Sequence, residues 1–456
     1  MNPDYSLIVS QQRAFFNSNA TKSVAFRIQQ LRKLKNALQT NEQALMKAID
    51  SDFKKSEFDT YTNELMLVYA DINEAVRKVK KWARRKRTRT NLINFPAKSY
   101  VISEPLGVSL IIGAWNYPYQ LSFAPMVAAI AAGCTVILKP SELPAATSRV
   151  MARIIAENFP QEYITVVEGS ISETTALLEQ KFDKIFFTGS VPVGRIVYQA
   201  AAKQLIPVTL ELGGKSPAFI TESCNMKMSV KRLVWAKFLN AGQTCIAPDY
   251  VLVHQSVKQT FLDALSAEIH QSDFRIENGN YVQIINHRNG ERLSALLDQS
   301  TIYLGGTYNR ETRYFEPTVL TDSTFEDRVM QEEIFGPILP VITYNDLSEA
   351  IQQVKERPKP LSCYIFTSDL RIKQRILQEV SFGGGAVNDA IMHVSNSHLP
   401  FGGVGESGIG SYHGIAGFNA FSHYKSILDK PTWFELNLKY SPHSLKKLNF
   451  IKKVLK

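Results

Sequence analysis

The sequence predicts an α/β protein in which a Rossmann-like dinucleotide-binding domain is followed by a second α/β domain. Three observations predict this class. A chain of 456 residues, 45% hydrophobic and 21% charged, has the length and balance of a globular protein with two or three domains. After Pro105, short apolar runs alternate with helix-length segments, a pattern typical of parallel βαβ units. A second alternating region follows Gly214.

The expected elements follow from the spacing of apolar residues. Before Pro105, spacings of three and four predict helices over about residues 22–50 and 60–86. The first alternating region predicts strands at 108–112, 135–138, 164–167, 184–187 and 207–210, with helices at 118–132 and 144–159. The second region predicts strands at 250–253, 339–344, 363–366 and 385–387.

Residues 106–138 contain no charged side chain and could be mistaken for a membrane span. Three glycines and two prolines interrupt them, and a spanning helix would have to satisfy the backbone groups that these residues free. A buried strand, loop, helix and second strand are therefore favoured. The N-terminus shows no secretory signal, and the four cysteines lack metal-site or disulfide spacing, so we expect a reducing cytoplasm and no metal.

Basic residues concentrate in two places. Between Arg77 and Arg89 lie nine Lys or Arg residues and no acid. A solvated helix end is favoured there, with attraction to nucleic acid or a membrane surface as the alternative. From Ser444 onward, apolar residues recur near helical spacing among lysines, which predicts a short basic amphipathic helix. Packing on a partner subunit is favoured for this helix, and contact with a membrane surface is the alternative.

Two glycine motifs fail the tests for nucleotide binding, and a third segment passes them. Residues 403–408 match the dinucleotide fingerprint but follow no strand, and residues 214–216 lack the earlier glycine of a phosphate loop. In contrast, Gly189 permits a tight turn after an apolar strand, and Ser190 suits the N-cap of the helix that follows. Its N–H groups would face a pyrophosphate, although many such turns bind nothing.

Cys245 is the candidate nucleophile. Cys134 and Cys363 lie in apolar surroundings and are expected to be small buried hydrophobes, whereas Cys224 suggests no role. Cys245 instead follows a polar turn in which Gly242 permits close backbone approach.

Six motifs, between about residues 100 and 425, resemble those of the aldehyde dehydrogenase superfamily and occur in the same order. Their amino-acid sequences most resemble those of the class 3 and fatty-aldehyde branch. The motifs are Trp115-Asn116-Tyr117-Pro118, Lys139-Pro140-Ser141-Glu142, Glu211-Leu212-Gly213-Gly214-Lys215, Phe238-Leu239-Asn240-Ala241-Gly242-Gln243-Thr244-Cys245, Glu333-Ile334-Phe335-Gly336-Pro337 and Pro400-Phe401-Gly402-Gly403.

The resemblance implies oxidation of an aldehyde to a carboxylic acid with NAD or NADP. Cys245 would attack the aldehyde carbon, while the side-chain amide of Asn116 holds the oxyanion. After hydride transfer, Glu211 would activate the water that hydrolyses the thioester. Two alternatives remain: an acylating dehydrogenase that passes the thioester to coenzyme A, and a non-catalytic binding protein on the same scaffold.

The resemblance also implies a cofactor site and substrate contacts. Because the carboxylate of Glu142 would accept a hydrogen bond from a ribose hydroxyl and repel a 2′-phosphate, a preference for NAD is expected, with NADP possible. Tyr117 and His413 are expected to contact the substrate, and the aromatic lining favours medium or long aliphatic or aromatic aldehydes. The implied cofactor residues are Trp115, Lys139, Glu142, Gly189, Ser190, Gly194, Leu212, Gly213, Glu333 and Phe335.

The family resemblance finally implies a domain layout and a homodimer, with no nucleic-acid partner. A bridging element that pairs across the dimer completes the layout. The expected parts are a dinucleotide-binding domain (1–82 and 106–210), a catalytic domain (211–395), the bridging element (83–105 and 396–425) and a C-terminal tail (426–456).

Overall fold

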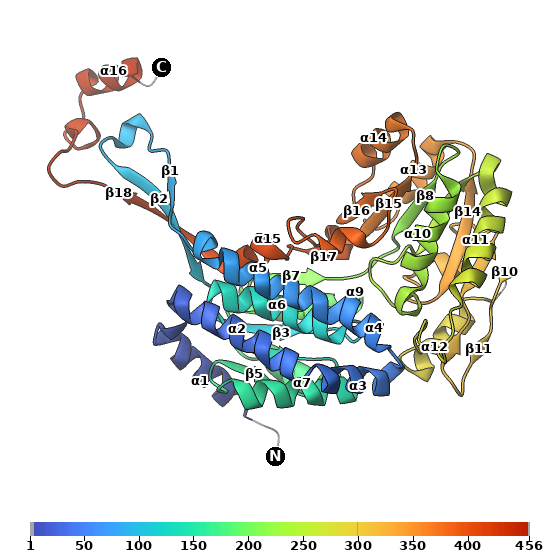
Figure 1. Cartoon of the computed structure of the whole chain (residues 1–456). Helices are drawn as coiled ribbons and strands as arrows, with labels where there is room; N and C mark the ends of the chain where they lie inside the picture. The colour runs from blue at the N-terminus through green and yellow to red at the C-terminus, as the bar shows by residue number, and fades with distance from the viewer. Residues whose placement is uncertain (1–3, 299, 455–456) are drawn as a thin grey trace. The chain divides into compact units, whose positions relative to one another are not determined.

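The computed structural model describes residues 4–298 and 300–454, and the chain divides into two compact units. The larger unit comprises Met1–Trp82 and Pro105–Ser422, and the smaller unit comprises Ala83–Glu104 and His423–Lys456. Figure 1 shows their helices and strands. No helix formed by the described residues combines the length and apolar character that crossing a bilayer requires.

A six-stranded sheet forms the first half of the larger unit, in the order β17-β7-β6-β3-β4-β5. All neighbouring strands are parallel except β17, which pairs antiparallel with β7. The chain winds outward from β3 in both directions, so a switch point lies between β3 and β6. The strands are β3 (Val108–Ile112), β4 (Thr135–Lys139), β5 (Ile164–Val166), β6 (Lys184–Thr188), β7 (Val208–Glu211) and β17 (Gly408–Ile409).

Helices cover this sheet because its central strands are apolar on both faces. Every residue of β3, β4 and β6 is buried, as expected for parallel strands between two helical layers. Helix α6 packs on β3 and β4 and is itself covered by α2 and α5. The helices of this half are α1 (Tyr5–Asn17), α2 (Val24–Thr40), α3 (Glu42–Phe53), α4 (Glu57–Thr60), α5 (Met66–Trp82), α6 (Pro118–Ala132), α7 (Ala145–Asn158), α8 (Ile171–Leu178), α9 (Val191–Lys203) and α15 (Gly414–Ala420).

A seven-stranded sheet forms the other half, in the order β10-β13-β14-β9-β8-β15-β16. Only β10 is antiparallel to its neighbour. The strands are β8 (Pro217–Ile220), β9 (Tyr250–His254), β10 (Thr301–Leu304), β13 (Thr318–Thr321), β14 (Ile338–Tyr344), β15 (Ser362–Phe366) and β16 (Gly384–Val387), with a separate hairpin of β11 (Tyr308–Asn309) and β12 (Tyr314–Phe315). The helices are α10 (Met226–Phe238), α11 (Lys258–Ser272), α12 (His287–Ala295), α13 (Leu347–Lys355) and α14 (Leu370–Glu379).

The smaller unit contains a three-stranded sheet in the order β1-β2-β18 and one helix. Strand β1 pairs antiparallel with β2, and all three residues of β1 are exposed. The elements are β1 (Lys86–Thr88), β2 (Lys98–Pro105), β18 (Ser422–Asp429) and α16 (Leu445–Val454).

Most elements expected from apolar spacing are present, and several differ in extent. All nine predicted strands occur within one residue of their expected bounds, and the predicted tail helix is α16. The helix expected over 60–86 was wrong at both ends, because Tyr61–Leu65 is a π-helical turn and α5 ends at Trp82. The basic run therefore continues past the helix end into β1, where a strand was not expected. Strand β8 was also missed.

Candidate active site

The predicted site residues of the first half follow the carboxyl ends of parallel strands. Asn116 lies in the loop after β3, Lys139 ends β4, Gly189 follows β6, and Glu211 ends β7. Because these strands are parallel, their carboxyl ends share one edge of the sheet. The edge includes the switch point between β3 and β6, where open α/β sheets bind their ligands.

The turn that carries Cys245 has an unusual backbone. It follows α10 through a 3₁₀ turn, and three consecutive residues have positive φ: Asn240 (55°), Ala241 (53°) and Gly242 (70°). A side chain at position 242 would place Cβ 2.2 Å from the carbonyl oxygen of Gly336, so only glycine fits there. A strained backbone of this kind persists where the surrounding structure holds it, often at functional sites.

Hydrogen bonds join this turn to the loop that carries Asn116. The Asn116 side-chain amide donates to the carbonyl oxygen of Gln243 (3.0 Å). The amide of Asn240 donates to the same oxygen and to the carbonyl oxygen of Asn116, both at 3.1 Å. The hydroxyl groups of Tyr117 and Thr244 form a further link of 2.7 Å. The structure therefore brings the predicted oxyanion donor, one predicted substrate contact and the turn that carries Cys245 together.

A buried ion pair supports the Asn116 loop from behind. Lys55 Nζ lies 2.6 Å from Glu64 Oε1, and both side chains are almost fully buried. Lys55 also donates to the carbonyl oxygen of Asn116 (3.3 Å) and lies 4.1 Å from the ring centre of Tyr117. The second carboxylate oxygen of Glu64 accepts from the backbone N–H groups of Tyr119 and Gln120 at the start of α6.

The surroundings of Cys245 disfavour a free thiolate. The side chain keeps partial solvent exposure but lies deep in the site, and burial is the main reason that its pKa is raised. The neighbouring carboxylates of Glu333 and Glu211 raise the thiol pKa further, whereas the N–H groups of Cys245 and Ile246 lower it. The thiol is therefore protonated at neutral pH until the charge balance around it changes.

Glu211 is a buried carboxyl group with neither oxygen hydrogen-bonded to any described residue. Burial raises its pKa well above the usual value, and the cation of Lys184 partly offsets this effect. Lys184 is itself buried on β6, where desolvation lowers its pKa to about 7, and its ammonium group donates to the hydroxyl of Thr209 (2.7 Å). A carboxyl group with a raised pKa is a stronger base once it ionises.

Four predicted cofactor residues form a close-packed cradle. A Cβ atom at Gly213 would lie 2.0 Å from Glu333 Oε2, so the absence of a side chain permits the approach of this carboxylate. Similarly, a Cβ atom at Gly194 would lie 2.5 Å from Leu212 Cδ2. Beside them, the rings of Trp115 and Phe335 meet edge to face, with centroids 5.3 Å apart.

Two further features of the cradle suit a dinucleotide. Ser190 occupies the N-cap position of α9 but its side chain makes no capping bond, so the first N–H groups of this helix have no side-chain partner there. At the end of β4, the buried ammonium group of Lys139 lies 3.9 Å from the more exposed Glu142 carboxylate. A helix N-terminus for phosphate and a Lys–Glu pair for ribose hydroxyls fit NAD.

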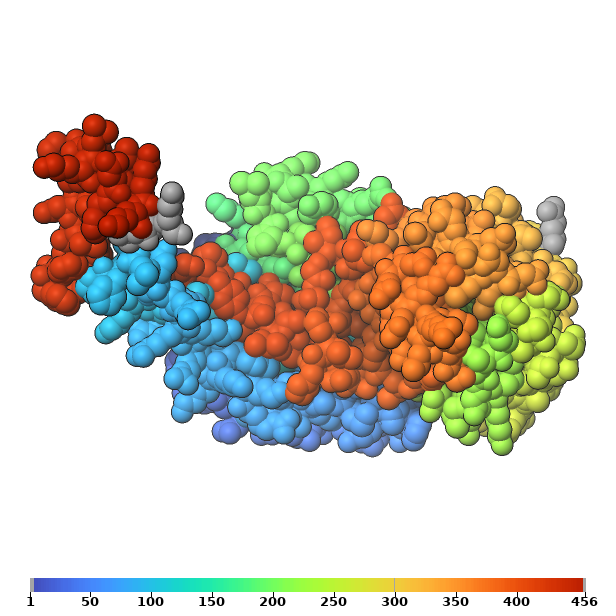
Figure 2. All heavy atoms as spheres, turned by 90° about the horizontal axis from the view of Figure 1, so that it is seen from above, coloured from blue at the N-terminus to red at the C-terminus, as the bar shows by residue number. Residues whose placement is uncertain are grey.

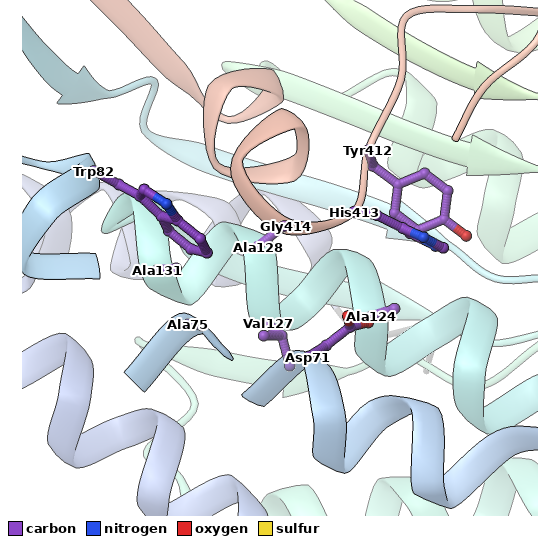
Figure 3. A pocket seen from close by; sticks show the side chains of 10 residues that line it. All are labelled: Asp71, Ala75, Trp82, Ala124, Val127, Ala128, Ala131, Tyr412, His413 and Gly414. Atoms are coloured by element: carbon purple, nitrogen blue, oxygen red, sulfur yellow. The ribbon is translucent and has the colours of Figure 1, made fainter. Parts of the chain in front are cut away.

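His413 lies in a small pocket between α5, α6 and α15 (Figure 3). Its ring stacks on Phe401 and lies beside that of Tyr412, and burial lowers the His413 pKa to about 4. Figure 3 shows Tyr412 and His413 together at one end of the pocket and Trp82 at the other. Its volume of about 20 Å³ accommodates about one water molecule, so this pocket alone does not hold an aldehyde chain.

Sequence reasoning missed four residues that the structure places at this site: Lys55, Glu64, Lys184 and Tyr412. Tyr412 lies close enough to Glu211 and Cys245 for both to affect its pKa. One of the four carried a usable signal, because Lys184 is a charged residue at the start of an otherwise apolar strand. Lys55 and Glu64 sit in a polar stretch with nothing to distinguish them.

Comparison with known proteins identifies the family. Residues 2–427 match the sequence model of the aldehyde dehydrogenase family. The chain belongs to this family. It is 46% identical to the 4,4'-diaponeurosporen-aldehyde dehydrogenase of Staphylococcus aureus, over 97% of each protein. It is 42% identical to aldehyde dehydrogenase family 3 member A2 of Mus musculus, over 97% of this chain and 93% of the relative.

Solved structures agree with this assignment. A structure titled as the substrate-bound state of Staphylococcus aureus AldH matches with a TM-score of 0.97 at 45% identity, and the match covers the whole of both chains. The predicted fold, the resemblance to the class 3 branch and the enzyme class are confirmed. The chain is an NAD(P)-dependent aldehyde dehydrogenase, and its relatives include NAD⁺-bound and NADP-preferring members. The roles of individual residues stay predictions.

The charge on Glu333 should control the reactivity of Cys245. Glu333 has a pKa raised to about 8, mainly by burial, so it becomes an anion beside the thiol only as the pH passes this value. That anion raises the thiol pKa. With Glu333→Gln, alkylation of Cys245 by iodoacetamide should therefore be faster above pH 8 and nearly unchanged below pH 7. Peptide mapping by mass spectrometry measures the rate at Cys245 alone.

The exposed neighbour Glu332 supplies the matched control, because Glu332→Gln removes a charge on the same loop from a side chain that pairs with Arg292. Equal profiles for the two variants would contradict the assigned influence of Glu333.

Proposed function

We propose that Cys245, Asn116 and Glu211 oxidise aldehydes to carboxylic acids through a covalent intermediate on the cysteine. One observation carries this proposal: hydrogen bonds hold the Cys245 turn against the Asn116 amide, within electrostatic reach of the unpartnered carboxyl of Glu211. A nucleophile, a hydrogen-bond donor and a base are the three groups that acyl transfer from an aldehyde requires.

The first step forms a bond between Cys245 Sγ and the aldehyde carbon. The thiol proton passes to solvent water, and the carbonyl π electrons move onto the oxygen, which becomes an anion. Asn116 uses one N–H to bind the carbonyl of Gln243, so its second N–H is available for this oxyanion. The backbone N–H of Cys245 supplies a second donor.

The second step leaves a thioester on Cys245. The oxyanion electrons reform the carbonyl double bond as a hydride leaves the carbon. Bound NAD(P)⁺ supplies the hydride acceptor, and Gly213, Glu333, Trp115 and Phe335 would hold its nicotinamide end. Lys139, Glu142 and the N-terminus of α9 would hold the other end.

Hydrolysis then regenerates the enzyme. Glu211 takes a proton from water, the resulting hydroxide adds to the thioester carbon, and the Cys245 thiolate leaves as the carboxylic acid is released. Transfer of the acyl group onto coenzyme A requires that water be kept away from the thioester. A carboxylate that activates water works against this transfer. The presence of Glu211 therefore favours hydrolysis over the acylating alternative.

Lys55 and Glu64 position the oxyanion donor in this scheme. Lys55 binds the carbonyl of Asn116, and Glu64 binds the first turn of the following helix. Removing one partner of a buried ion pair leaves an uncompensated charge and costs about 3–5 kcal/mol. The pair therefore holds the Asn116 amide in place, although neither side chain contacts the substrate.

Single-turnover kinetics test the catalytic assignments. Cys245→Ser should abolish turnover, whereas Glu211→Gln should give a burst of about one reduced cofactor per site and then stop, because the thioester forms but is not hydrolysed. Cys224→Ser removes a partly exposed thiol and should keep full activity. Retained turnover in Cys245→Ser would end the proposal.

With a series of linear aldehydes, kcat/KM of the unmodified enzyme should rise with chain length.

The positioning role of Lys55 is tested against the loss of the donor itself. Asn116→Ala should lower kcat about 10²–10³-fold, as for other oxyanion donors. Lys55→Met with Glu64→Gln keeps the buried site neutral and should lower kcat with little change in the affinity for NAD⁺. The conservative Lys55→Arg should recover part of the loss. A double variant that loses cofactor affinity and kcat together would show a purely structural role.

We further propose that NAD⁺ is preferred over NADP⁺. The Glu142 carboxylate would accept from the 2′-hydroxyl and repel a 2′-phosphate, and its exposure leaves it free to do so. Initial rates should favour NAD⁺, and Glu142→Gln should narrow the difference. Glu157→Gln, which removes an exposed carboxylate near the C-terminal end of α7, is the control. A clear NADP⁺ preference in the unmodified enzyme would refute the argument.

We also propose a long apolar aldehyde as substrate, a homodimer and a cytoplasmic location. The name of the Staphylococcus aureus relative supports a long apolar aldehyde as the substrate. For the homodimer, β18 is an outer strand of its sheet, and an outer strand can pair with a strand from a second copy. The four cysteines are all free, which suits a reducing compartment.

The division at residue 211 into cofactor and catalytic domains follows the boundary between the two large sheets.

A further inference from the structure

Lys215 ends the motif that begins at Glu211, and the proposed function gives it no role. The motif lies in the connection between β7 and β8, which Figure 1 shows as a long segment that runs from the first sheet to the second. The Lys215 side chain is 14% exposed and pairs with Asp249. Its ammonium group also donates to the carbonyl oxygens of Val329 (3.0 Å) and Glu332 (2.9 Å). An ammonium group has three N–H bonds, so all of them are used.

Asp249 completes a clamp on the loop that carries Glu333. Its side chain is almost fully buried, and one carboxylate oxygen accepts from the backbone N–H of Ile334 (3.0 Å). The Lys215–Asp249 clamp therefore binds the main chain on both sides of Glu333, at the carbonyl of the residue before it and at the N–H of the residue after it. The loop is held whatever side chain stands at position 333.

The same segment also holds the Glu333 side chain. The carboxylate lies against Gly213, where a Cβ atom would collide with it. Burial raises the pKa of this carboxyl group, and a hydrogen bond from the backbone N–H of Gly214 lowers it. The other charged groups that face Glu333 are Asp249, Lys215, Arg292 and, from α10, Lys237. Three consecutive residues, 213 to 215, thus contact both the side chain of Glu333 and the main chain around it.

The backbone directly after the clamp is strained. Phe335 has a φ of 48°, which a residue with a bulky side chain rarely adopts. Such a conformation persists only where the surrounding structure holds it, and it occurs often at functional sites. The bond from Ile334 to Asp249 precedes Phe335 by one residue, and Arg292 donates to the carbonyl oxygen of Ile334 (2.6 Å). Loss of the clamp would let this loop relax.

We propose that Lys215 is a positioning residue for Glu333. Together with Asp249 it fixes the loop so that the Glu333 carboxylate stays at the nicotinamide end of the cofactor site and beside Cys245. Lys215 acts only through this loop, because none of its N–H bonds is left for a substrate. The inference rests on the proposed function, since that proposal places Glu333 at the cofactor.

A neutral double variant tests the positioning role. Lys215→Met with Asp249→Asn removes both charges, so that no unpaired charge stays buried. With Glu333 displaced, kcat should fall by as much as about 100-fold, because small misplacements at the reacting groups are costly. The affinity for AMP, which occupies only the adenosine end of the site, should not change in titration calorimetry. Lys215→Arg keeps the charge and the donors and should recover most of kcat.

Alkylation of Cys245 reports the position of Glu333 without turnover. In the unmodified protein, the Glu333 anion that forms as the pH passes about 8 should slow the reaction with iodoacetamide. The double variant should lose this slowing, as Glu333→Gln does, because the carboxylate has moved away from the thiol. A change of charge around an unmoved Glu333 would instead shift the midpoint of the pH profile and leave its amplitude.

Lys258 and Asp322 supply the matched control. They form another Lys–Asp pair, with a separation of 2.5 Å. Lys258 begins α11, which Figure 1 and Figure 2 show in yellow-green at one end of the larger unit. Lys258→Met with Asp322→Asn should leave kcat, the affinity for AMP and the alkylation profile unchanged.

Two outcomes overturn the inference. The clamp variants could keep the kcat and the alkylation profile of the unmodified protein, or they could lose AMP affinity in step with kcat, which would show a purely structural role. If the double variant does not fold, Asp249→Asn alone keeps the acceptor for Ile334 and should show a smaller effect of the same kind; an unchanged profile there overturns the inference too. Failure of the catalytic scheme is distinct, because Cys245→Ser would then retain turnover.

Discussion

The carbonyl oxygen of Gln243 is the point at which the two halves of the active site meet. It accepts from the amide of Asn116, which belongs to the loop after a strand of the six-stranded sheet, and from Asn240 in the turn before β9 of the seven-stranded sheet. Neither loop has regular structure that would fix its position alone. Because the bond from Asn116 is buried and joins loops 127 residues apart, the relative placement of nucleophile and donor depends on it.

Burial of charge determines the chemistry around these bonds. The thiol of Cys245 and the carboxyl group of Glu211 both have raised pKa values, so the resting site favours neutral groups. Lys55 differs from both, because its ammonium group lies 2.6 Å from the carboxylate of Glu64. The molecule thus uses paired charges for support and unpaired titratable groups for reaction, as expected when desolvation rather than hydrogen bonding sets the pKa.

Apolar patterning predicted the framework because buried parallel strands admit few polar residues. The run at 108–112 became β3 without change, and the helix over 118–132 was also found with its expected bounds. Exposed elements were harder to predict: all of β1 is exposed, and its basic sequence gives no strand signal.

The residues of the active site were also predictable only in part. Ordered motifs led to Cys245, Asn116 and Glu211, because each lies in or directly before a loop with a distinctive local sequence. The support by Lys55 and Glu64 could not be foreseen, since it depends on contacts across 55 and more positions that no local pattern records.

The π-helical turn at Tyr61–Leu65 has a consequence for insertions and deletions in this region. Such a turn accommodates one residue more than an α-helix does over the same length. This surplus residue sets the direction in which Glu64 points relative to the side chains of α5. Loss of a single residue here would let the helix wind regularly, which would displace Glu64 within the turn while the flanking helical turns stay nearly in phase. The spacing of this short segment is therefore under tighter constraint than its polar, unremarkable composition suggests.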